Sequence, residues 1–161
     1  MPFLREYNFE TAVPKFLKDN IGLSIIRNDI CNEDFWITDT NGEKQVICET
    51  KSYLRGLKKT GIYNIFTHRE SNDLDEDFPA LLIVNPHTVA SCWKEKIQTI
   101  PPQDYKLAVK NNVLIMRIKD LLFFWNLIIE GKKTKDDLFS LITNEKGWLE
   151  VNKEGKIISH K

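Results

Sequence analysis

Two continuous apolar runs constrain the fold of this chain most strongly. They are residues 80–84 (ALLIV) and 113–117 (VLIMR), and neither alternates apolar with polar residues. Strands that are apolar on both faces are typical of parallel sheets covered by helices on each side. The first run ends at Asn85-Pro86, a pair that favours the end of a strand. Both runs are therefore predicted to be buried strands at the centre of a sheet.

A hairpin signal lies before these runs. Residues 35–38 (FWIT) and 44–50 (KQVICET) flank Asn41-Gly42, the dipeptide most typical of a tight β-turn. Residues 22–27 (GLSIIR) are expected to add a third strand. Since the hairpin is antiparallel, we expect a mixed sheet.

Helical periodicity appears between and after the strands. Residues 8–19 place apolar side chains at helical spacing, with Pro14 as a kink or a later start. Thr134 and Asp137 predict a capped last helix. The expected helices cover residues 8–19, 57–69, 91–99, 118–130 and 134–144, and a terminal hairpin (WLEV, KIIS) follows them.

The predicted fold class is therefore α/β, with a mixed central β-sheet flanked by helices. We expect one domain over residues 1–161, with a core over about 8–130 and an appended helix and hairpin over 133–161. A length of 161 residues suits one domain.

Charge, cysteine content and the lack of long apolar segments limit the partners and the cellular compartment that we expect for this protein. The formal net charge is zero, so any basic surface must be local. The 3 cysteines form no CxxC pair and are expected to be reduced thiols in a cytoplasmic protein. The N-terminus has no signal-peptide pattern, and the longest apolar run is too short to span a bilayer. We therefore expect no membrane partner.

Charged side chains mark the outer ends of the hairpin. If Asn41-Gly42 forms a two-residue turn, Asp34 lies opposite Glu49, with Cβ atoms about 5 Å apart. Two like charges repel at this distance, but a divalent cation between them reverses the sign of the interaction. Lys51 projects from the same face as Glu49. A three-residue loop with a bulge at Gly42 is the alternative, and it would shift the pairing by one residue.

This set of side chains suits metal-assisted phosphodiester hydrolysis. Carboxylate oxygens hold Mg²⁺ or Mn²⁺, and the cation polarises the phosphoryl group and activates a water molecule. A nearby ammonium group orients the attacking water and stabilises the negative charge that develops. The competing interpretation is an exposed hairpin with scattered charges and no site.

Asp34, followed after fourteen residues by Glu49-Thr50-Lys51, resembles the D…(D/E)xK signature of the restriction-endonuclease-like PD-(D/E)xK nucleases. The resemblance covers roughly residues 8–128. It implies that Asp34 and Glu49 bind metal and that Lys51 serves the nucleophile. It also implies that Glu10, on the first helix, reaches the same metal, and that Asn64 stands where many members have glutamine.

The sequence departs from this pattern at two positions. Glu33 stands where the signature has proline, and the side chain of Asn64 is shorter than glutamine. The second departure weakens the assignment of Asn64.

Polar and basic residues after the signature are the candidates for binding nucleic acid. Cations offset phosphate charge, although the same residues would also suit a solvated helix face. The candidates are Arg55, Lys58, Lys59, Asn64, His68 and Arg69.

The sequence thus predicts a Mg²⁺-dependent nuclease that acts on DNA. The alternative is a catalytically inactive module of the same fold that binds nucleic acid or protein, as a domain of a larger protein. For either function, the expected partners are nucleic acid and a second copy of the chain in a homodimer, or the rest of a larger protein. A glycosidase with paired carboxylates fits poorly, because such folds usually need a longer chain.

Overall fold

The computed structural model describes residues 2–27, 34–88 and 99–161, and of residues 2–8 only the backbone. Its strands form one seven-stranded sheet whose spatial order follows the sequence. Strands β3 to β6 run parallel, whereas β1, β2 and β7 are antiparallel to their neighbours. The strands are β1 (Ser24–Arg27), β2 (Phe35–Thr38), β3 (Lys44–Ser52), β4 (Ala80–Asn85), β5 (Val113–Arg117), β6 (Gly147–Val151) and β7 (Ile157–His160).

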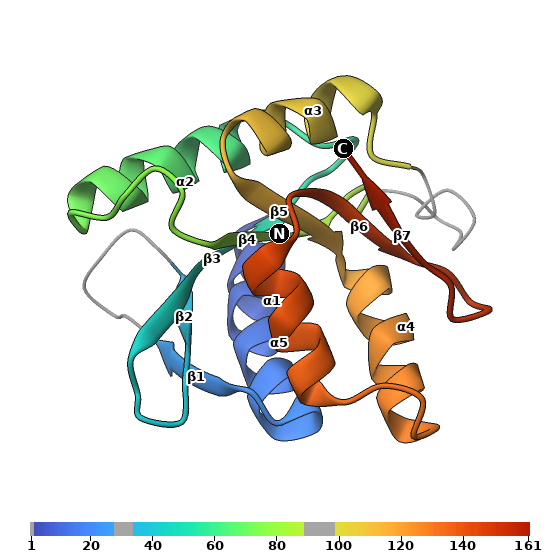
Figure 1. Cartoon of the computed structure of the whole chain (residues 1–161). Coiled ribbons are helices and arrows are strands. Elements are labelled where there is room, and N and C mark those ends of the chain that lie inside the picture. Colours follow the sequence, from blue (N-terminus) through green and yellow to red (C-terminus); the bar gives the residue numbers. More distant parts are fainter. Residues whose placement is uncertain (1, 28–33, 89–98) are drawn as a thin grey trace.

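Helices cover both faces of this sheet. In Figure 1, α1, α4 and α5 lie against one face, and α2 and α3 lie against the other. The helices are α1 (Pro2–Phe16), α2 (Thr60–Ser71), α3 (Pro102–Lys110), α4 (Ile118–Ile129) and α5 (Lys135–Asn144). The predicted α/β class, with a mixed sheet between helices, is confirmed.

Each face of the sheet carries its own apolar core. Leu81 and Ile83 of β4 point into the core shared with α1, α4 and α5. Leu82 and Val84 alternate with them and point into the core under α2 and α3. Residues 80–84 and 113–117 are buried throughout, so the prediction from the two apolar runs is confirmed.

The hairpin differs from the predicted two-residue turn. The Asp39 N–H donates to the Glu43 carbonyl, and Gly42 takes a φ of 82°, which together define a three-residue loop. The register then shifts between Ile37 and Thr38, because Gln45 is an extra residue on β3.

The extra residue Gln45 restores the pairing register that the three-residue loop displaces. Phe35 lies opposite Cys48 and Ile37 opposite Val46, as the two-residue turn had predicted. The turn prediction was therefore wrong, while the predicted pairing next to the candidate acids is correct.

Several helix boundaries also differ from expectation. The first helix begins before residue 8 and passes through the buried Pro14, and a π-helical turn (Leu17–Ile21) follows it. The helix predicted over 57–69 begins at Thr60. The α3 helix was not predicted, because Pro101-Pro102 suggests a loop although proline is well suited to a first helical turn. The helix predicted over 91–99 lies almost wholly outside the described residues.

The C-terminal helix and hairpin extend the same sheet. The β6 strand pairs with β5 in parallel, and α5 contributes Leu138 and Ile142 to the core beneath α1 and α4. No helix in the described ranges is both long and apolar enough to cross a membrane.

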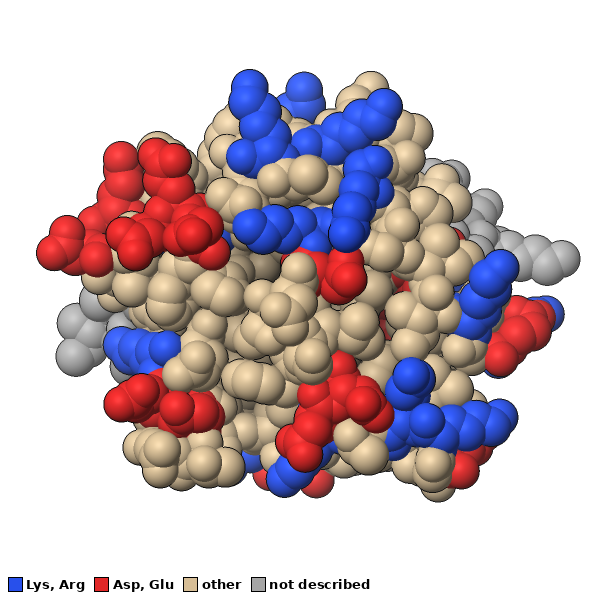
Figure 2. Space-filling view, in the orientation of Figure 1, with Lys and Arg blue, Asp and Glu red and all other residues tan. Residues whose placement is uncertain are grey.

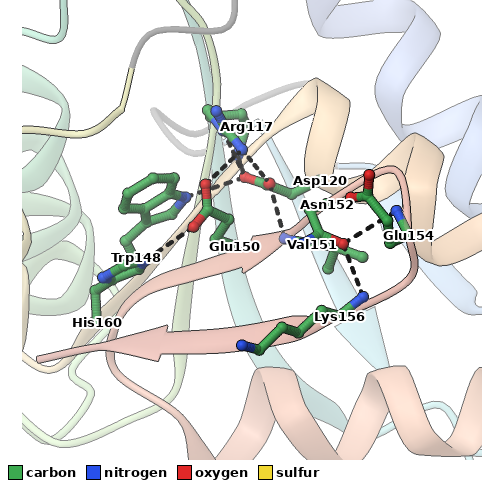
Figure 3. Close-up of polar contacts among 9 residues, drawn as sticks. All are labelled: Arg117, Asp120, Trp148, Glu150, Val151, Asn152, Glu154, Lys156 and His160. Carbon is green, nitrogen blue, oxygen red and sulfur yellow. Dashed lines mark hydrogen bonds and ion pairs between the residues drawn. The ribbon is translucent and has the colours of Figure 1, made fainter.

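Asp120 connects the end of β5 to β6 (Figure 3). Its carboxylate is 0% exposed and accepts hydrogen bonds from the Arg117 backbone N–H at 2.8 Å and the Arg117 guanidinium at 2.7 and 3.0 Å. The indole N–H of Trp148 and the backbone N–H of Val151 also donate to it, at 3.1 and 3.0 Å. One side chain thus joins two strands at the start of α4.

We expect Asp120→Asn to lower the free energy of unfolding by about 3–5 kcal/mol, because an amide nitrogen cannot accept these bonds and Arg117 loses its buried partner. Urea unfolding followed by circular dichroism measures this loss. Asp75→Asn, at an exposed loop position, is the matched control and should change stability by less than about 0.5 kcal/mol. Equal effects of the two substitutions would contradict the role of Asp120.

Candidate active site

Asp34 lies immediately before β2 and is held against β3. Its backbone N–H donates to the Cys48 carbonyl at 3.2 Å, which extends the hairpin ladder by one residue. Its Oδ2 accepts hydrogen bonds from the Thr50 backbone N–H at 2.5 Å and the Thr50 hydroxyl at 2.6 Å. These bonds fix the carboxylate beside the residue that follows Glu49.

Glu49 is buried in β3, with 2% of its surface exposed. Its Oε1 lies 3.0 Å from the ammonium group of Lys51, and its Oε2 lies 3.0 Å from Nε2 of His68 on α2. A buried carboxylate requires such partners, because leaving its charge unpaired costs several kcal/mol. The structure therefore brings Asp34, Glu49 and Lys51 together, and it adds His68 to the group.

The two carboxylates repel each other. Burial, and then the negative charge of Glu49, raise the pKa of Asp34 to about 6, although the hydrogen bonds from Thr50 act in the opposite direction. The charge of Glu10 on α1 makes a smaller contribution in the same direction. The site thus holds more negative charge than its own cations offset.

Lys51 keeps its proton in this setting. Burial alone would lower its pKa, but the charges of Glu49, Asp34 and Glu10, together with the hydrogen bond to Glu49, outweigh burial and raise it. The ammonium group thus lies near three carboxylates that favour its charged form.

His68 was predicted to contact nucleic acid, but it is only 5% exposed and faces Glu49. Its other ring nitrogen, Nδ1, is buried and makes no hydrogen bond within the part of the chain that the structure describes. An unsatisfied buried polar atom costs about 1–3 kcal/mol. His68 is thus placed to support Glu49, at a cost, and it lies away from solvent.

Arg69 was likewise predicted to bind nucleic acid, and its surroundings contradict this prediction. It is 3% exposed, and its guanidinium donates to the carbonyls of Phe78, Asn111 and Asn112. This network ties the end of α2 to the loop before β4 and to the start of β5. Arg69 therefore has a structural role.

The other predicted binding residues remain accessible. Arg55, Lys58 and Lys59 are exposed in the loop before α2 and at its start, and Asn64 is half-buried one turn before His68. Asn64 and His68 share one side of the helix. The structure therefore leaves Arg55, Lys58, Lys59 and Asn64 available for a ligand.

Thr50 is the residue of the site that sequence reasoning missed. It is the unspecified middle residue of the Glu49-Thr50-Lys51 triplet, and no periodicity distinguishes it from a core threonine. Its two donors to Asp34 are evident only once the hairpin register brings Asp34 beside β3.

The donor set fits a hard divalent cation. Asp34 and Glu49 provide carboxylate oxygens, and their mutual repulsion is the feature that a cation would relieve. Across the described residues, no three Asp, Glu, His or Cys side chains are gathered into a ligand set. Mg²⁺ usually binds through one or two carboxylates and retains several water molecules, so two carboxylates are sufficient.

The fold is similar to that of a known endonuclease. A solved structure of the restriction endonuclease FokI bound to DNA superposes with a TM-score of 0.55 and 13% sequence identity. The similarity covers 91% of this chain and 28% of the FokI chain. No model of a known protein family matches the sequence, and no curated protein does either. The comparison thus supports a restriction-endonuclease-like fold.

The raised pKa of Asp34 predicts a pH-dependent penalty on stability. A folded-state pKa near 6, above the ordinary 3.8, means that Asp34 costs stability as pH rises through this interval and that the full cost remains above it. Asp34→Asn removes this cost while its amide oxygen can still accept from Thr50. After allowance for solvent screening, we expect the variant to be more stable by about 1–2 kcal/mol at pH 7.5.

Urea unfolding of both proteins in EDTA, at several pH values from about 4 to 7.5, tests this expectation. The difference between variant and wild type should grow with pH and level off above about 6.5. A difference that is constant with pH would contradict the raised pKa.

The contact between His68 and Glu49 predicts a graded effect of substitution. His68→Ala leaves Glu49 with one partner fewer and should reduce both the free energy of unfolding, by about 2–4 kcal/mol, and the affinity for Mn²⁺. His68→Gln retains an N–H donor and should recover part of both losses. Calorimetric titration with Mn²⁺ measures the affinity, and a His68→Gln protein no better than His68→Ala would exclude the hydrogen bond as the cause.

Proposed function

We propose that this protein is a Mg²⁺- or Mn²⁺-dependent nuclease that hydrolyses phosphodiester bonds in DNA. The observation that supports the proposal is the convergence of Asp34, Glu49 and Lys51 at one end of the sheet, with Thr50 and His68 fixing the two carboxylates. The similarity of the fold to an endonuclease whose structure contains DNA supports the same substrate class.

In this proposal Asp34 and Glu49 hold the cation, and Glu10 adds negative charge from α1. The chemistry that the cation supplies when bound is Lewis-acid polarisation of a phosphoryl group. The chain itself has to hold both carboxylates in a fixed orientation. Thr50 does so for Asp34 by donating two hydrogen bonds, and His68 does so for Glu49.

Lys51 has the role of a charged donor. Its ammonium group lies at the boundary of the site, where its side chain is 25% exposed while that of Glu49 is 3% exposed. From this position it can donate to an attacking water or to a phosphoryl oxygen and stabilise the negative charge of the transition state. The neighbouring acids raise the pKa of Lys51, which favours this role of a charged donor.

The alternative is an inactive module of the same fold that binds nucleic acid or protein. The ion pair between Lys51 and Glu49 favours this alternative, because it gives the buried acid a partner without any metal. The two functions differ in whether Glu49 binds a divalent cation.

Cleavage of plasmid, linear and single-stranded DNA, and of RNA, in Mg²⁺ or Mn²⁺ is the direct test. Lys51→Ala and Glu49→Gln should each lower the rate at least about a hundredfold, as expected when one group that stabilises transition-state charge is removed. Lys44→Ala, at an exposed lysine of the same strand, is the control and should cleave at the wild-type rate.

Calorimetry with Mn²⁺ separates the proposed function from the alternative. A binding isotherm that Glu49→Gln abolishes would support the nuclease, and folded Lys51→Ala protein that cleaves normally would refute the assigned role of Lys51. Wild-type protein that neither binds Mn²⁺ nor cleaves any of these substrates would favour the inactive module.

A further inference from the structure

We infer that a basic groove between α1 and the edge strand β1 binds the phosphodiester backbone of a nucleic-acid strand that leads to the candidate active site. This inference rests on the proposed function for its substrate class. The residues that suggest it, Lys15, Lys18 and Arg27, differ from all those predicted from sequence to bind nucleic acid.

The groove is formed by α1, the π-helical turn after it, and β1. It has a volume of about 420 Å³, within the range of about 300–1,000 Å³ that is typical of ligand pockets. Thr11, Lys15 and Lys18 line the helical side, since positions four and seven residues apart share one side of a helix. Arg27 lines the strand side, on the face of β1 that also packs Ile25 toward α1.

The charges that line the groove are mostly positive. Lys15, Lys18 and Arg27 are all exposed, and Asp19 is the acid that accompanies them among the lining residues. The protein has a formal net charge of zero, so this excess is local. A row of accessible cations along an open groove matches the chemistry of a phosphate backbone, which presents one negative charge at each step.

The position of the groove connects it to the candidate site. Arg27 lies opposite Phe35 in the β1–β2 ladder, and Phe35 directly follows Asp34. Paired residues of antiparallel strands have Cα atoms about 5 Å apart, so Arg27 and Asp34 are close neighbours. On the helical side, Thr11 directly follows Glu10, whose charge affects both Asp34 and Lys51.

From this end the groove continues away from the site along α1. Lys15 lies about one turn beyond Thr11, and Lys18 lies about one further turn away, since each helical residue advances about 1.5 Å. Thr11 also has a buried hydroxyl that makes no hydrogen bond within the described part of the chain. A buried polar group without a partner requires an explanation, and a water or ligand that completes its hydrogen bonding is one of them.

The molecule has a second basic area that serves as an internal comparison. In the view of Figure 2, Lys and Arg side chains gather over the side of the molecule where α3 lies in Figure 1, and acidic side chains gather near the end of α2. Lys106 and Lys110 of α3 are exposed lysines one turn apart, as Lys15 and Lys18 nearly are. Substituting either lysine pair removes the same amount of positive charge, in the groove for one pair and on α3 for the other.

The test measures binding of a short fluorescein-labelled single-stranded DNA by fluorescence anisotropy. Every protein carries Glu49→Gln, so that binding is observed without cleavage. Lys15→Gln with Lys18→Gln should weaken binding about tenfold, and Arg27→Gln should weaken it further. Each lost phosphate contact should also reduce the slope of log K against log salt by about 0.7.

The control is Lys106→Gln with Lys110→Gln, which removes the same charge from α3 and should leave both affinity and salt slope near those of the parent protein. Equal losses in the two pairs would overturn the inference, because they would show attraction without a defined groove. Displacement of the labelled DNA by polyglutamate as readily as by unlabelled DNA would also overturn it, in favour of an acidic-peptide partner.

The outcome is separable from that of the proposed function. If wild-type protein cleaves DNA but the groove variants bind as tightly as the control, the groove is refuted and the nuclease stands. If no cleavage occurs in any metal but binding still depends on Lys15, Lys18 and Arg27, the groove stands and the nuclease assignment fails.

Discussion

The sheet depends on the buried carboxylate of Asp120 where β5 and β6 separate. The two strands pair at only two positions, Leu114 with Gly147 and Ile115 with Trp148, before β5 turns into α4. Beyond that point the carboxylate of Asp120 takes the place of strand carbonyls as the hydrogen-bond acceptor. It accepts hydrogen bonds from N–H groups of Arg117, Trp148 and Val151. Without it, β6 and β7 would be attached to the sheet through a very short ladder.

The carboxylates of Asp120 and Asp34 differ in their surroundings. Asp120 is surrounded by donors, and its charge holds strands together. Asp34 has fewer donors and lies beside a second carboxylate, so its charge is only partly compensated. Natural folds tend to retain such uncompensated charge where a ligand uses it. Asp120 therefore has the environment of a structural acid, whereas Asp34 has the environment of an acid whose charge a ligand could complete.

The sequence was sufficient for the central features of this fold. The runs at 80–84 and 113–117 predicted buried strands because short segments that are apolar on both faces are typical of strands with helices on each side. The Thr134–Asp137 cap placed the start of α5.

Sequence reasoning was insufficient where a contact depends on distant segments. In the sequence, His68 and Arg69 look like exposed positions of a surface helix. The loops that bury Arg69 and the strand that faces His68 come from elsewhere in the chain. The α3 helix was missed because proline is ambiguous between a loop and a first helical turn.

The paired irregularities of the β2–β3 hairpin separate its tip from its base. The loop at Gly42 displaces the register by one residue, and the extra residue Gln45 returns it before Ile37 and Val46 meet. In this hairpin the displacement at the tip is corrected within a few residues, so the pairs next to Asp34 and Glu49 keep the unshifted register. Nothing corrects a displacement beyond that point, so a one-residue insertion between Val46 and Glu49 would turn Glu49 to the opposite face of the sheet.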